Sequence, residues 1–117
     1  MTIEHLESGE TLSQAVVHGN TVYVCGLTAT NRKLDISGQT KEVLAKIDDR
    51  LAKCGSDKSQ LLSATIYLTD IMLKDAMNAV WKDWLGDLKR PSRACVGGIE
   101  LMPGVLVEIV VVAAKGA

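Results

Sequence analysis

The segment from residue 105 to residue 114 constrains the fold more than any other part of the sequence. Its odd-numbered positions are all aliphatic, and its even-numbered positions are aliphatic apart from Glu108. Successive side chains of a strand point to opposite faces, so a strand with two apolar rows needs cover on both faces. Helices of so short a chain can cover one face. We therefore expect a neighbouring subunit to cover the other.

Turn residues and hydrophobic periodicity divide the rest of the chain into alternating strands and helices. Gly19-Asn20 predicts a tight hairpin turn, Gly55 a helix end, and Met102-Pro103-Gly104 a turn between the last two strands. The predicted elements are strands at 14–18 and 21–27, a helix at 37–54, a strand at 62–71, a helix at 73–85, and strands at 92–101 and 105–114. This order predicts one α+β domain over residues 1–117, with both helices on one face of a mixed sheet.

The composition narrows the class of protein. Hydrophobic residues make up 47% of the chain and aromatic residues only 3%, so the core must be aliphatic. The net charge is -1 with no Lys/Arg block, which gives no support to a nucleic-acid binder. Three cysteines without CxxC spacing fit neither a disulfide framework nor a zinc site. No signal peptide or bilayer-spanning run is present, so we expect a cytoplasmic protein without a metal.

Glu108 is the residue in this sequence that most needs a partner. A buried carboxylate without a cation or hydrogen bonds costs several kcal/mol. The preceding strand supplies Arg93 and, on the same face, Cys95. If an even-numbered turn joins the two strands, both share a face with Glu108. Spacing alone favours an ion pair that holds strands or subunits together, but the same groups suit a site in which Arg93 binds a carboxylate and Glu108 moves a proton.

Several motifs in order resemble those of the Rid/YjgF family. RPSRACV (90–96) followed by VLVEI (105–109) is similar to the family's C-terminal signature, P-x-R-x-C-V, a short loop and V-x-[IV]-E-[IV]. Upstream, NTVYVCG (20–26), ATIYLTD (64–70) and MNAVW (77–81) resemble the family's two earlier strands and its second helix. The resemblance spans nearly the whole chain.

The resemblance implies a chorismate-mutase-like α+β fold and a barrel-like homotrimer with clefts between subunits. It implies a cofactor-free deaminase that hydrolyses enamines and imines, such as 2-aminoacrylate released by pyridoxal-phosphate enzymes, to 2-keto acids and ammonia. Arg93 would clamp the substrate carboxylate, and Glu108 would position and activate the attacking water. The pocket would be lined by Cys95, Cys25, the backbone at Gly26, and Asn78.

Departures from the family pattern leave the native substrate open. Leu12 stands where deaminating members carry a tyrosine, Cys25 where a serine is usual, and Gly97-Gly98 where Glu-x is usual. A small-molecule-binding or chaperone-like trimer without turnover is therefore one alternative, and an endoribonuclease or translation inhibitor is another. A nucleophilic role for Cys95 lacks a histidine in a matching motif to act as its base.

Overall fold

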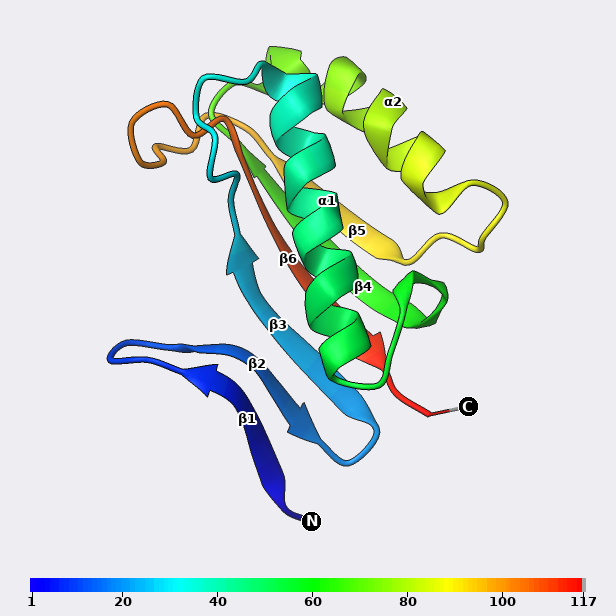
Figure 1. Ribbon diagram of the computed structural model, residues 1–117. Helices are drawn as coiled ribbons and strands as arrows, with labels where there is room; N and C mark the ends of the chain where they lie inside the picture. Colours follow the sequence, from blue (N-terminus) through cyan, green and yellow to red (C-terminus); the bar gives the residue numbers. More distant parts are fainter. Residues whose placement is uncertain (117) are drawn as a thin grey trace.

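The computed structural model describes residues 1–116 and contains one six-stranded sheet with both helices on the same side (Figure 1). This arrangement confirms the predicted α+β class and the two-helix layer. The elements in chain order are β1 (Ile3–Ser8), β2 (Ser13–His18), β3 (Thr21–Leu27), α1 (Ile36–Lys53), the 3₁₀ turn η1 (Lys58–Gln60), β4 (Leu61–Leu68), the 3₁₀ turn η2 (Ile71–Leu73), α2 (Lys74–Leu85), β5 (Ser92–Val96) and β6 (Val107–Ala114).

The sheet order is β1-β2-β3-β6-β4-β5, so the doubly apolar strand β6 lies in its interior. All neighbouring pairs are antiparallel except β4 and β5, which are parallel and joined across the helix layer by α2. Val107, Ile109 and Val111 of β6 are buried beneath the helices. The opposite row, which contains Glu108 and Val110, is only half-buried, because both helices of the described residues lie on the other face.

The predicted hairpin between the last two strands is wrong, because β4 lies between β5 and β6. The turn itself exists, since Val105 N–H donates to Met102 O over 3.0 Å, but it lies within a loop that crosses from one side of β4 to the other. The predicted strand at 62–71 ends earlier, at Leu68. Asp70 stops it by accepting the Met72 N–H at 2.9 Å, which opens η2.

Helix α1 follows the predicted hydrophobic stripe and lies across the sheet. Asp35 caps its start by accepting the Gly38 N–H at 2.8 Å. Its apolar side contacts β3, β6 and α2. The stripe residues Val43, Leu44, Ile47 and Leu51 are all 1% exposed or less. Two polar residues of the same helix, Gln39 and Thr40, are also completely buried.

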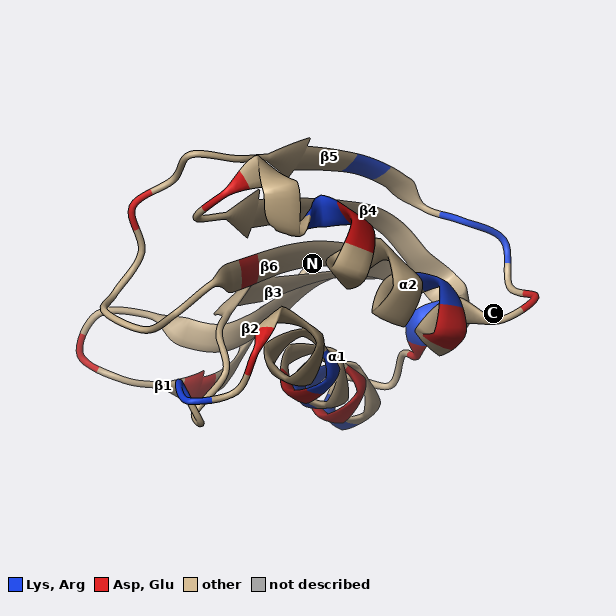
Figure 2. Ribbon diagram, turned by 90° about the horizontal axis from the view of Figure 1, so that it is seen from above, with Lys and Arg blue, Asp and Glu red and all other residues tan. Residues whose placement is uncertain are grey.

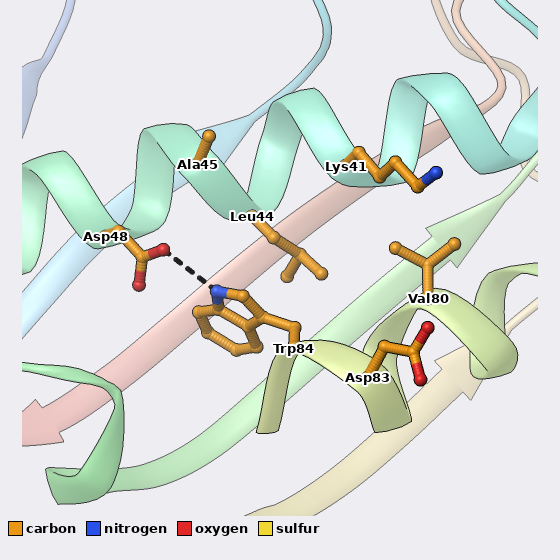
Figure 3. A pocket seen from close by; sticks show the side chains of 7 residues that line it. All are labelled: Lys41, Leu44, Ala45, Asp48, Val80, Asp83 and Trp84. Atoms are coloured by element: carbon orange, nitrogen blue, oxygen red, sulfur yellow. Dashed lines mark hydrogen bonds between the residues drawn. The ribbon is translucent and has the colours of Figure 1, made fainter. Parts of the chain in front are cut away.

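Helix α2 packs beside α1 and carries two tryptophans, of which Trp84 faces α1. Trp81 is buried, and its ring centroid lies 5.6 Å from that of Trp84. Trp84 Nε1 donates to Asp48 Oδ2 of α1 at 3.0 Å across an open pocket of about 280 Å³ (Figure 3). Neither helix in the described part of the chain combines the length and apolarity that crossing a bilayer requires.

Candidate active site

Two charged side chains stand out in the strands β2 to β6, which otherwise contain only uncharged residues and His18. Within strands β2 to β6, all of which the structure describes, Arg93 and Glu108 are the only Asp, Glu, Lys or Arg residues. The other charges lie mainly on the helices and loops, as Figure 2 shows. Placing a charge within a sheet costs solvation, so two such residues are candidates for a functional role.

Arg93 lies on the edge strand β5 and faces the helix layer. It pairs in register with Ala64 of β4, whose side chain is buried beneath the helices. Its guanidinium carbon lies 5.4 Å from the centroid of the Trp81 ring, a cation–π geometry that holds the fork in place. Arg93 also lines a pocket of about 220 Å³. The other residues that line this pocket are Asn78, Trp81, Lys82, Arg90 and Pro91.

Cys95 lies on the same face of β5 as Arg93, as strand alternation predicted, whereas Asn78 is among the residues that line the pocket with Arg93. Cys95 pairs with Ile66, which places its thiol on the same face as Arg93. Asn78 comes from α2, one turn before Trp81. Its Oδ1 is buried and has no hydrogen-bond partner within residues 1–116. An acceptor left unsatisfied in this way costs free energy, which a ligand or a further chain could recover by donating to it.

Glu108 lies on the open face of the sheet, directly over Gly26. The pairing of β3 with β6 shifts between Val24 and Leu27, which leaves Gly26 in a bulge. A Cβ built on Gly26 would collide with Glu108 Oε2 and would stand 3.0 Å from Glu108 Cδ. Glycine at this position therefore makes the space that the carboxylate occupies.

The expected shared face of Arg93 and Glu108 is wrong within one chain. Arg93 pairs with Ala64, and Glu108 pairs with Tyr67 on the same strand β4. Ala64 and Tyr67 are three residues apart and so point to opposite faces. Among residues 1–116, neither charged group forms a salt bridge. The structural ion pair within one chain is thereby excluded, and the two groups lie on opposite faces of the sheet.

Cys25 precedes Gly26 on β3 and is half-buried. Its Sγ lies 3.8 Å from Gln14 Oε1, an oxygen that also accepts from Arg50 Nε of α1 at 3.2 Å. Burial raises the pKa of the Cys25 thiol; the Arg50 charge opposes this effect and the Glu108 charge adds to it. The thiol is thus protonated near neutral pH and lies beside Gln14 behind the Gly26 bulge.

Trp81 belongs to this site, although a tryptophan on the apolar side of a helix is typical of a core residue. Its spacing of three from Asn78 on one helix placed both on the same side of α2. What the sequence lacked was the parallel placement of β5, which brings Arg93 under that side. Trp81 therefore serves both the core and the orientation of Arg93.

A family model, two curated relatives and a solved structure match nearly the whole chain. The family model described as Endoribonuclease L-PSP matches residues 2–115. The RutC family protein YoaB of Escherichia coli K12 is 40% identical over 114 residues, which are 97% of this chain and 99% of that protein. A RutC family protein of Haemophilus influenzae is 38% identical over 97% of this chain and 98% of its own length. The crystal structure of NMB1025, a YjgF family member from Neisseria meningitidis, superimposes with a TM-score of 0.94 at 37% identity and covers 100% of this chain and 98% of that one.

Proposed function

Since the chain belongs to the Rid/YjgF family, whose model is described as Endoribonuclease L-PSP, we propose that it hydrolyses reactive imines and enamines that carry a carboxylate. The products are a 2-keto acid and ammonia. The observation that carries this proposal is Arg93, an arginine held over the Trp81 ring and facing a pocket. A guanidinium fork in such a place suits bidentate binding of a small carboxylate.

The chemistry needs one water and no cofactor. The enamine first takes a proton at carbon and becomes the protonated imine. The water oxygen then attacks the imine carbon while Glu108 accepts one water proton, which gives a neutral carbinolamine. Glu108 gives this proton to the nitrogen, the C–N bond breaks and ammonia leaves, and the hydroxyl proton passes back to Glu108 as the carbonyl of the keto acid forms. Arg93 holds the neighbouring carboxylate so that the attacked carbon stays within reach of the water.

This mechanism requires more than one subunit, because Arg93 and Glu108 lie on opposite faces of their own sheet. A homotrimer with its sites in clefts between subunits lets Arg93 of one copy meet Glu108 of the next. The half-buried row of β6 and the exposed Tyr23 support such an assembly, because they leave an apolar face open in the single chain. Residence in the reducing cytoplasm belongs to the same proposal and suits three free cysteines.

The test is keto-acid release from 2-aminoacrylate and 2-aminocrotonate generated in situ by a serine/threonine dehydratase. Arg93→Ala should lose the acceleration, and Glu108→Gln should lower kcat by roughly 100-fold or more, the scale of general acid–base catalysis. Glu100→Gln, which changes an exposed loop glutamate in the same way, is the matched control and should keep wild-type rates. No acceleration by folded wild-type protein would reject the deaminase on these substrates.

A binding protein without turnover is the second candidate. It is favoured by Leu12, which stands where deaminating relatives carry tyrosine and is half exposed between β1 and β2. Calorimetry with 2-oxobutanoate separates the two: binding that Arg93→Ala abolishes, together with no imine hydrolysis, would support the binding protein.

Ribonuclease activity is the third candidate and comes from the description of the family model. The net charge of -1 offers no basic groove to support it. RNA-cleaving activity that co-purifies with the protein and is lost in Arg93→Ala would support the ribonuclease.

A further inference from the structure

Gln39 is a buried glutamine whose side chain joins two loops at the Glu108 end of the sheet. It is 0% exposed, although it lies in the first turns of α1. Its Nε2 donates to Leu34 O at 3.0 Å and to Gly104 O at 2.9 Å. Its Oε1 accepts the Leu106 N–H at 2.9 Å. Both amide hydrogens and the oxygen are therefore used, and none of the three bonds stays within the helix.

The two loops are those that carry the chain away from Gly26 and towards Glu108. Residues 28–35 follow the bulge of β3, and residues 97–106 lead into β6. β3 pairs with β6 only as far as Ile109, through Leu27, so the backbone before β6 lacks a strand partner on that side. Gln39 Oε1 takes the place of this partner for the Leu106 N–H, two residues before Glu108. On the other side, Leu106 O accepts the Thr69 N–H at 3.1 Å.

A second contact holds the same two loops together outside the helix. Arg32 Nη1 donates to Pro103 O at 3.3 Å, and a Cβ built on Gly104 would approach Arg32 Cβ to 3.0 Å. Arg32 is exposed, and its single long hydrogen bond is weak by comparison with the three shorter, partly buried ones of Gln39. The register between the loops thus depends chiefly on Gln39.

We propose that Gln39 is a positioning residue for Glu108. It holds together the loop that follows Gly26 (residues 28–35) and the loop that precedes Glu108 (residues 97–106), and so sets the Glu108 carboxylate against Gly26. Its side chain touches neither the carboxylate nor the pocket of Arg93, so it acts through the backbone at Leu34, Gly104 and Leu106. The catalytic consequence rests on the proposed function, whereas the positional consequence does not. Loss of Gln39 should therefore lower kcat and leave the Arg93-dependent KM nearly unchanged.

The test compares Gln39→Leu with Thr40→Val. Both change a polar side chain that is 0% exposed on the same turn of α1, but the Thr40 hydroxyl donates to Ile36 O at 2.7 Å, inside the helix. Gln39→Leu should speed exchange of the Leu106 amide about tenfold or more, as expected for the loss of a buried hydrogen bond. It should also shift the ¹³C signal of the Glu108 carboxyl. Thr40→Val should do neither at equal global stability.

The kinetic readout separates this inference from the proposed function. If wild-type protein hydrolyses imines, Gln39→Leu should lower kcat by about 10- to 100-fold with KM within about threefold of wild type. If wild-type protein has no such activity, the proposed function fails, and the exchange and ¹³C measurements still decide the role of Gln39. A Leu106 amide and a Glu108 carboxyl signal unchanged from those of Thr40→Val would overturn the inference.

Gln39→Met, which is unbranched and fills a similar volume, replaces Gln39→Leu if the latter does not fold. If neither variant folds, the wild-type protein decides. Slow exchange of both the Gln39 side-chain amide and the Leu106 amide supports the bridge. Exchange of the Leu106 amide at the rate of an unstructured peptide refutes it.

Discussion

At the scale of single residues, the position of the Glu108 carboxylate depends on the absence of a side chain at Gly26. Its φ lies outside the left-handed region, so alanine is strained there only by contact with Glu108. The colliding atom is the end of a flexible side chain that can rotate away. Gly26→Ala should therefore change the free energy of unfolding by less than about 1 kcal/mol, while displacement of the carboxylate lowers kcat by about 100-fold.

Gly9→Ala is the matched control for this prediction. A Cβ on Gly9 meets only Leu12 O at an ordinary 3.7 Å, and its φ is also outside the left-handed region. Thermal melts and imine hydrolysis of both variants should show similar stabilities and very different rates. Equal rates would mean that the position of Glu108 over Gly26 does not matter for the reaction.

The kinds of residue at the candidate site could be predicted from the sequence, but not their arrangement. A carboxylate within an apolar segment marked Glu108, and alternation correctly placed Arg93 and Cys95 on one face. The relation between Arg93 and Glu108 depended on strand order, which a turn at Met102-Pro103-Gly104 does not determine. Nothing in the local pattern indicated that β4, which precedes β5 in the chain and is separated from it by α2, would come between β5 and β6.

At the scale of elements, hydrophobic periodicity predicted the elements with a buried face and missed the exposed strand β1. The α1 stripe and the β2–β3 hairpin follow the expected positions, with His18 paired to Thr21 across the turn. β1 was not predicted because its residues are nearly all exposed and show no apolar alternation. Its strand conformation comes mainly from backbone pairing with β2, and Leu6 is its one partly buried residue. A side chain such as Gln39 likewise gives no periodic signal for the bonds it forms.

We expect acid to weaken the attachment of the 28–35 loop to α1. Glu42 accepts the backbone N–H groups of Thr30 and Asn31, the latter at 3.1 Å, and Lys46 Nζ donates to Thr28 O at 2.8 Å. The two backbone donors hold the pKa of the Glu42 carboxyl below its usual value. A lowered folded-state pKa means that this contribution is complete above the ordinary value of about 4.3 and is lost as the pH falls below it.

Glu42→Gln measures this contribution directly. The variant cannot titrate at this position, so the stability difference between wild type and variant should be constant from pH 7 to about pH 5 and should shrink as the pH falls below about 4.3. Urea unfolding at several pH values gives both free energies. A difference that stays constant down to pH 3 would show that Glu42 holds the loop in its neutral form equally well.

At the scale of the whole molecule, one face of the sheet is covered by the helices and the other face is uncovered in the single chain. Helices bury Val107 and Ile109 completely, whereas Val110 on the other side of β6 is half-buried and Tyr23 is 49% exposed. Arg93 lies on the helix-covered face at the β5 edge, and Glu108 lies on the uncovered face. A ring of three identical copies brings different surfaces of neighbouring subunits together, as any closed cyclic assembly with more than two members does. The same contact can then cover the apolar row and complete the site.

Subunit mixing tests this arrangement. Arg93→Ala and Glu108→Gln proteins, each inactive alone, are unfolded together in equal amounts and refolded. If each site takes Arg93 from one subunit and Glu108 from another, the two are intact independently, each with probability of one half. About a quarter of wild-type activity should then return, because rotational symmetry repeats the same contact around the ring. If one subunit supplied both residues, every site would carry a defect and the mixture would stay inactive. Light scattering of the same sample must give three chains per particle, since a monomer would contradict the assembly before any rate is measured.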